Sequence, residues 1–364
     1  MANKRLFYAV YQVGIYPDGT AAGINDFSNT GPNVHGLQSC GMTTRFALDQ
    51  IFEIGQLDIY DQVENVPEVE LTLEKVLDGK ALLYHLATIN RGATEGPDLA
   101  ARSNARCLVA VSYFPDTQSA ASGDSLNEVV LSGMFCSAAN YTFPTEGNCT
   151  EAVTLVGNNK VWAIGAGSTV FEGYHTNADS PVSSIQRRQN VQFGEGHAHV
   201  CRLPHGLSGG IPGVTTSGTV ALVGGEFSAH IQSLKTTCDL GRENMFELGR
   251  KAPYFRYVNF PVEVKCDIEV YNVSGDYVDC SESTDNLVFQ PIFISTQDGT
   301  YVDLGKKNKL TSVTETGGNA GTGGGNRTST YSYSNWNYLI VTHTGAFPHA
   351  TDNDHSGWWI TYTG

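Results

Sequence analysis

Two segments of the chain alternate strictly between apolar and polar residues. The segment 68–76 reads EVELTLEKV, and the segment 262–270 reads VEVKCDIEV. Alternation with a period of two places apolar side chains on one face of a β-strand and polar side chains on the other. Each segment therefore predicts a strand of an antiparallel sheet with one face on a core and one face in water. The polar positions are Glu68, Glu70, Thr72, Glu74, Glu263, Lys265, Asp267 and Glu269.

The two strands end a longer internal repeat. When residues 38–67 are compared with residues 232–261, nine of thirty positions are identical, whereas chance gives about two. The strands that follow are equivalent after a slip of one residue. The offset of 194 is close to half of the 364 residues, so the repeat indicates a duplicated domain and not a solenoid. The repeat signature consists of Phe52, Glu53, Gly55, Tyr60 and Pro67, with Phe246, Glu247, Gly249, Tyr254 and Pro261.

Short apolar runs predict further strands in both halves. Forty Gly and thirteen Pro, with many Thr, Val and Tyr, favour strands and turns over long helices. Helical periodicity is weak: residues 98–106 could form two turns, and residues 44–54 are ambiguous. The fold class is therefore mainly β, with about one short helix in each domain. The further strands are expected at 107–114, 128–136, 152–156, 161–164, 289–295, 336–343 and 357–362.

Two loosely patterned segments define the domain organisation. Residues 184–213 contain Gly, Pro and charge without an apolar period, as connectors do. We therefore expect a first β domain at 1–195 and a second at 196–364. Residues 315–327 form a Gly-rich stretch without the Lys-Ser/Thr of a phosphate-binding loop, so we expect an exposed loop.

Composition and charge exclude several classes of protein. A hydrophobic content of 40% with 16% charged residues is typical of a folded globular chain. No apolar run approaches the roughly 20 residues that span a bilayer, and the N-terminus does not read as a signal peptide. The net charge of −15 argues against a surface that grips phosphates. The acid-rich stretch 49–78, with Lys75 as its single base, is either an ordinary solvated face or a surface that repels nucleic acid.

The eight cysteines are scattered along the chain. Without a secretion signal, the expectation is reduced thiols in a cytoplasm. Oxidation in an assembled particle outside the cell stays an alternative, with Cys136 and Cys149 paired across a loop or Cys280 paired between subunits.

Three segments resemble one family. Residues 38–79, QSCGMTTRFALDQIFEIGQLDIYDQVENVPEVELTLEKVLDG, are similar to the N-terminal half of tail tube proteins of long-tailed bacteriophages. Residues 141–162 resemble a later part of the same domain, and residues 231–264 resemble the second half of its longer members. The resemblance implies two tandem β-barrel or sandwich domains whose long hairpins join those of neighbouring subunits into a continuous inner barrel.

The same resemblance implies a structural role in the virion tail, with assembly in the host cytoplasm. A tandem duplicate would form a pseudo-hexameric ring from three chains, and stacked rings would form a tube through which phage DNA passes without specific binding. The partners implied are further copies of the chain and tail sheath, baseplate or tail-terminator proteins, with no membrane. The polar positions of the two alternating strands are then candidates to line the lumen, although the outer wall or the contact between rings stays open.

Catalytic and metal-binding motifs are not evident. His197, His199 and Cys201 alternate in GHAHVC and would share one face of a strand, which makes them candidate zinc ligands, but their spacing matches no familiar finger. Asp352, Asp354 and His355 are expected to form a polar turn. No nucleophile elbow, zinc-protease motif or dinucleotide fingerprint is present, so we expect neither an enzyme nor a cofactor. The alternatives are a capsid decoration or receptor-binding adhesion protein, and a metal-dependent enzyme built around the His/Cys group.

Overall fold

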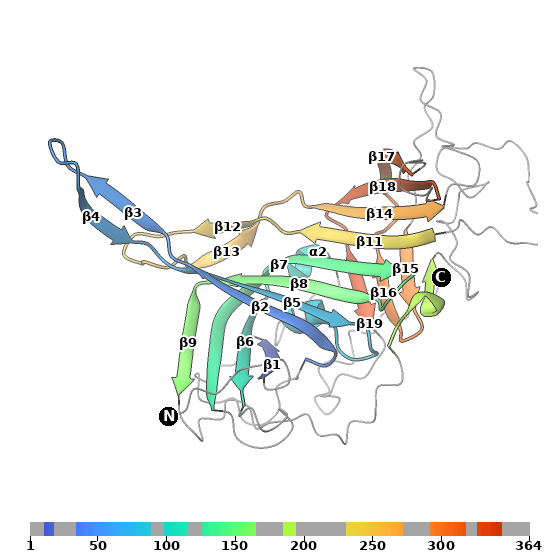
Figure 1. The fold of residues 1–364 in the computed structure, drawn as a ribbon, viewed down its shortest axis with the longest axis horizontal. Coiled ribbons are helices and arrows are strands. Elements are labelled where there is room, and N and C mark those ends of the chain that lie inside the picture. The colour runs from blue at the N-terminus through green and yellow to red at the C-terminus, as the bar shows by residue number, and fades with distance from the viewer. Residues whose placement is uncertain are drawn as a thin grey trace, which may run out of the picture.

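The computed structural model describes residues 11–17, 34–88, 98–114, 126–164, 185–193, 231–271, 292–317 and 326–343. Within these residues the chain is mainly β, as the sequence predicts (Figure 1). The largest sheet follows one antiparallel path that draws strands from both halves of the chain. In spatial order the path is β17 (Lys309–Thr316), β18 (Thr328–Trp336), β14 (Glu263–Tyr271), β11 (Ile231–Asp239), β7 (Asn127–Pro144), β8 (Thr150–Gly157), β5 (Glu68–Val76) and β2 (Leu37–Arg45).

Smaller elements extend this sheet and cover its apolar face. The N-terminal half of β7 pairs with β6 and β9, and β6 pairs with β1. Helix α1 lies against β1, β6, β7 and β8. The remaining strands of the large sheet are β1 (Tyr11–Pro17), β6 (Arg106–Tyr113) and β9 (Asn159–Ile164), and a second sheet consists of β10 (Val191–Phe193), β15 (Phe293–Thr296), β16 (Thr300–Asp303) and β19 (Ile340–His343). Two two-stranded ribbons are formed by β3 (Leu48–Phe52) with β4 (Ile59–Glu64) and by β12 (Arg242–Met245) with β13 (Phe255–Val258). The helices are α1 (Leu83–Thr88), α2 (Leu99–Arg102) and the 3₁₀ helix η2 (Arg188–Asn190).

The internal repeat is visible as two equivalent four-stranded units. The first unit is β2–β5–β8–β7 and the second is β11–β14–β18–β17. Strand β11 begins and ends 194 residues after β2. A register shift falls at the same place in each unit, between Leu37 and Ser39 and between Ile231 and Ser233. A second register shift, in β7 and in β17, also falls at equivalent positions. The one-residue slip expected in the following strand is confirmed, because Val69 and Val264 occupy equivalent ladder positions.

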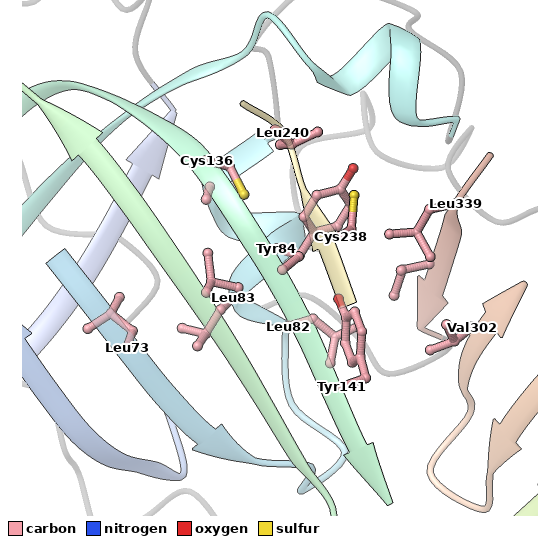
Figure 2. Packing of buried hydrophobic residues seen from close by; sticks show 14 of the residues in the cluster. Leu73, Leu82, Leu83, Tyr84, Cys136, Tyr141, Cys238, Leu240, Val302 and Leu339 are labelled. Atoms are coloured by element: carbon pink, nitrogen blue, oxygen red, sulfur yellow. The ribbon is translucent and has the colours of Figure 1, made fainter. Parts of the chain in front are cut away.

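The apolar rows of the two predicted strands face one core. Val69, Leu71 and Leu73 on β5 and the inward residues of β14 belong to the same buried cluster. Figure 2 shows Tyr84, Tyr141 and Cys238 in this cluster, together with Val302 from the second sheet. Leu and Val side chains of this kind each stabilise the fold by about 1.5–3 kcal/mol when fully buried. The half-wet antiparallel sheet is therefore as the alternation predicts.

The structure corrects several expectations. Within the described residues the strands form an open sheet and do not close into a barrel. The segment 336–343 is not one strand: Trp336 ends β18, Asn337 turns with a φ of 63°, and β19 begins at Ile340. Asn tolerates this left-handed conformation, and its side-chain Oδ1 accepts the Val262 amide N–H at 2.6 Å. The ambiguous segment 44–54 is not helical but holds the end of β2 and all of β3, and both α-helices of the described residues lie in the first half.

The domain boundaries stay a prediction. Most of the expected connector 184–213 lies outside the described residues, and so does the centre of the Gly-rich stretch 315–327. At the ends of that stretch β17 stops at Thr316 and β18 starts at Thr328, and the two strands pair with each other. The two halves share the large sheet and the buried cluster.

Candidate assembly surface

The eight candidate polar residues lie on one face of the large sheet, which we call the polar face. Their neighbours on β5 and β14 point into the buried cluster, and the ladder continues without a break between these strands through β8, β7 and β11. The strands between them present mostly uncharged side chains on this face, Asn140, Thr142 and Thr154 among them, together with the exposed Lys235 and Asp239 of β11. The structure thus places both predicted rows on one face, at β5 and at β14.

Several of these acids are paired. The Glu70 carboxylate lies 2.8 Å from the Arg45 guanidinium, and that of Glu263 lies 3.2 Å from the Lys265 ammonium. The Ser233 hydroxyl donates to Glu269 at 3.0 Å, and the Ser332 hydroxyl donates to Asp267 at 2.7 Å. Exposed pairs of this kind contribute only about 0–1 kcal/mol each. They reduce the negative potential of the face without removing it.

The two repeat units meet inside the chain at the β7–β11 junction. Strand β11 pairs antiparallel with β7 from Ser233 opposite Pro144 to Asp239 opposite Ala138. Beyond the ladder, the Leu240 amide N–H donates to the Ser137 carbonyl oxygen at 2.8 Å. The core-facing residues of the junction are fully buried, since Thr236, Cys238 and Leu240 are at most 1% exposed.

The outer edges of the same path are open. Among the described residues β2 pairs only with β5, and β17 pairs only with β18. Strand β2 is the repeat equivalent of β11, yet its core-facing residues Cys40, Met42 and Thr44 are only half-buried, whereas the equivalent residues of β11 are buried. An uncovered strand edge offers a row of unpaired N–H and C=O groups to another strand.

Beyond β2–β5 and β11–β14 the two hairpins continue as twisted ribbons, which we call the first arm (residues 46–66) and the second arm (residues 240–260). Figure 1 shows both arms projecting past the same end of the sheet, the first arm farther than the second. The large apolar side chains exposed on the first arm are Phe46, Leu48, Ile51, Phe52, Ile54, Leu57, Ile59, Tyr60 and Val63. Those on the second arm are Phe246, Leu248, Tyr254, Tyr257 and Phe260. Apolar patches of this extent on a folded chain indicate an interaction surface.

The two arms have different surroundings. The second arm rests on the first unit, where Arg256 donates to Glu68 at 2.9 Å and to Asn158 at 3.0 Å. A cavity of about 520 Å³ lies between this arm and the root of the first arm, lined by residues such as Phe46 and Lys251. At the root of the second arm Leu240 is 1% exposed, whereas its equivalent Phe46 is 71% exposed. The first arm therefore lacks, within the described chain, the cover that its repeat copy has.

The described cysteines form no disulfide. Cys136 and Cys149 are both buried, and no disulfide joins them. Burial raises the pKa of Cys136 to about 12, which keeps this thiol protonated and unreactive at neutral pH. Cys201 and Cys280 lie outside the described residues.

The candidate zinc ligands His197, His199 and Cys201, like the polar turn around Asp354, lie outside the described residues. Within the described residues no group of His, Cys, Asp and Glu side chains could hold a metal ion. No helix in that part of the chain is long and apolar enough to cross a membrane.

The sequence did not reveal which residues make the two arms different in their contacts. Sequence reasoning treated Phe52 and Tyr60 only as markers of the repeat, although both side chains are more than half exposed. It also missed Lys309, which begins the edge strand β17, and Trp336, which ends the neighbouring strand β18. The signal was present in the first arm, where nine large apolar residues stand among acids in a segment without alternation.

No family model and no curated protein matches this chain. Among solved structures, a chain of the anti-feeding prophage baseplate has a TM-score of 0.31 and 11% identity, over 44% of this chain and 97% of that one. A chain of the cap that terminates the anti-feeding prophage tube has a TM-score of 0.30 and 11% identity, over 45% of this chain and 95% of that one. The structure of this chain is thus only weakly similar to these two chains.

Proposed function

We propose that this protein is a structural tail tube subunit whose copies join edge to edge, β17 of one copy pairing with β2 of the next. The observation that carries the proposal is the β7–β11 junction. Strand β11 is covered by β7 within the chain, while its repeat equivalent β2 has an open edge among the residues that the structure describes. The repeat equivalent of β7 is β17, which is the other open edge. A second copy therefore offers the strand that β2 lacks.

The internal junction also supplies the register. Thr237 lies opposite Asn140 at that junction. Its counterpart on β2 is Thr43, and the ladder positions of β17 make Thr314 the counterpart of Asn140. Thr43 of one copy is then expected opposite Thr314 of the next, in an antiparallel pair with both side chains on the polar face.

The polar face is expected to line the lumen, because helix α1 and the core residues of the second sheet occupy the apolar side. If the ring closed with the apolar side inward, helix α1 and the second sheet would fill the lumen. Three copies, each contributing the eight strands of the path, would close a barrel of 24 strands. At a strand spacing of about 4.8 Å and a tilt of about 40°, such a barrel is about 50 Å across its backbone. Barrels of about 16–18 strands already enclose an aqueous channel.

Ring closure by strand pairing removes both edges and covers the root of the first arm. The acid-rich face would let DNA slide without binding, since phosphates are not attracted to carboxylates. Stacking of such rings gives the tube that the family resemblance implies.

Thiol crosslinking tests the junction. In the variant Thr43→Cys/Thr314→Cys, the two thiols of neighbouring copies lie on opposite residues with Cβ atoms about 4.5–5.5 Å apart. Mild oxidation or a short thiol-reactive crosslinker should then convert the chain into covalent rings of three, read by denaturing electrophoresis without reductant.

The matched control is Thr43→Cys/Val313→Cys. A shift of one residue moves a side chain to the other face of the sheet, so this pair should stay largely uncrosslinked. Equal crosslinking in both variants, or none in the first at concentrations where the wild-type chain assembles, would show that β2 and β17 do not pair.

A further inference from the structure

We propose that the first arm of one copy docks across the β17 edge of the next copy, where Asp61 forms an ion pair with Lys309 of that neighbouring copy. The inference rests on the proposed function, because it assumes that β17 of one copy pairs with β2 of the next. It adds the residues that make the contact specific and that distinguish the junction between chains from the junction within one chain.

The second arm shows how an arm docks on the neighbouring unit. The ring of Phe255, on this arm, meets the ring of Phe135 on β7 edge to face, with centroids 5.1 Å apart. The guanidinium of Arg242 lies 5.2 Å from the centre of the same ring, and its Nε and Nη2 atoms donate to the Cys136 carbonyl oxygen at 2.8 and 2.6 Å. The middle of β7, beside the bulge at Cys136, is thus the site where the second arm docks.

The repeat converts these contacts into a prediction for the first arm. Phe255 lies opposite Met245, as Asp61 lies opposite Ile51, and both pairs are 194 residues apart in the chain. Asp61 is therefore the counterpart of Phe255. On the strand that receives the arm, Phe135 lies directly opposite Val156. Its counterpart in the second unit is Lys309, which lies directly opposite Ser334. The aromatic pair within the chain becomes an acid and a base between chains.

The charges around these two residues agree with this exchange. The first arm carries five acids and no Lys or Arg: Asp49, Glu53, Asp58, Asp61 and Glu64. The lysine loop, residues 306–309, leads into the first residue of β17 and reads KKNK, and its three lysines, Lys306, Lys307 and Lys309, are exposed. Opposite charges steer two surfaces together and reject misaligned contacts.

The apolar residues agree as well. Trp336 ends β18 beside the lysine loop and is 57% exposed. Its counterpart in the first unit is Asn158, which accepts a hydrogen bond from Arg256 of the second arm. The first arm has Gln62 where the second has Arg256, flanked by the exposed Val63. The apolar ring of Trp336 is suited to contact the apolar first arm, just as the amide of Asn158 is suited to bind Arg256 of the second arm.

Charge reversal measures the pair. Asp61→Lys places two cations at every junction, and Lys309→Asp places two anions there. Each change should raise the concentration at which half of the chain is assembled by about tenfold, measured by sedimentation at low salt. The double variant Asp61→Lys/Lys309→Asp restores opposite charges at every junction and should return that concentration to within about twofold of wild type. High salt should shrink all of these differences.

Asp58→Lys is the matched control, because it makes the same charge change at the tip of the same arm, away from the Lys309 counterpart. It should weaken assembly less than Asp61→Lys. A double variant no better than its two parents would overturn the ion pair, while assembly of the wild type would still support the ring. A wild-type chain that stays monomeric under all conditions would overturn the ring itself, and the docking with it.

Discussion

At the scale of single residues, the features that sequence reasoning missed are charges inside the core. Lys75 continues the apolar row of β5 and is fully buried, where its ammonium lies 3.0 Å from Asp78 and donates to the Ala81 carbonyl oxygen at 2.9 Å. Glu151 lies opposite it on β8 and accepts hydrogen bonds from the amides of Leu83 and Tyr84 at 2.7 and 3.0 Å. Burial raises the pKa of Glu151. A charge on the apolar side of an alternating strand was visible in the sequence, but its partners come from distant segments.

His85 gives the pH dependence of stability. Its ring is buried, and Nε2 donates to the Val341 carbonyl oxygen at 2.6 Å. Burial, with Arg102 nearby, lowers its pKa to about 3. The folded chain therefore holds His85 neutral while the unfolded chain protonates it below about pH 6.5. Its contribution is complete above pH 6.5 and is lost as the pH falls toward 3.

The variant His85→Gln tests this contribution. Between pH 7 and pH 5 the wild type should lose about 2 kcal/mol more of its free energy of unfolding than the variant, measured by chemical denaturation. Glutamine keeps a donor for the Val341 carbonyl, so the variant should remain folded at pH 7. Identical losses in the two proteins would mean that His85 titrates normally in the folded state.

At the scale of elements, alternation and repetition predicted much and composition predicted little. The strands at 68–76 and 262–270 were predicted because Val, Leu and Ile alternate with charged residues. Strands β17 and β18 were missed because Thr and Ser occupy both of their faces and hide the inward Tyr331 and Tyr333. Helix α1 was missed because its six residues are too short to show a helical period.

The open junction predicts opposite effects for two equivalent substitutions. Phe46→Asp changes a side chain that is 71% exposed, so the free energy of unfolding of the isolated chain should change by less than about 0.5 kcal/mol while assembly is lost. Leu240→Asp buries a charge at the equivalent position inside the chain and should destabilise it by more than about 4 kcal/mol. Denaturation and sedimentation of both variants measure the two effects. Normal assembly of Phe46→Asp would contradict the proposed junction.

At the scale of the whole molecule, the 194-residue offset anticipated two units, but not that they share one sheet. Which strand of the first unit meets which strand of the second depends on β7 and β11, and the segment 38–67 carries no mark of that pairing. The eight polar residues were grouped from strand parity alone, and the structure places them on one face. Whether that face lines a lumen is a property of the assembly.

The polar face can be tested by giving it phosphate-binding charge. In Thr72→Lys/Glu74→Lys the substituted side chains are at least partly exposed on β5, and assembly should be retained. Assembled wild-type protein should not retain a short DNA duplex, whereas the variant should retain it at low salt and release it as salt rises. Gln56→Lys/Asp58→Lys makes the same total charge change at the arm tip and should retain less DNA. Equal retention by the two variants would place the polar face away from the lumen.

The most direct measurement is cryo-electron microscopy of the purified chain across a range of concentrations. The account predicts hollow rings or stacked tubes in which each ring holds three copies, with β17 of one copy beside β2 of the next and the acid-rich face turned toward the hole. Persistent monomers, or an assembly in which the β2 edge stays open, would contradict it.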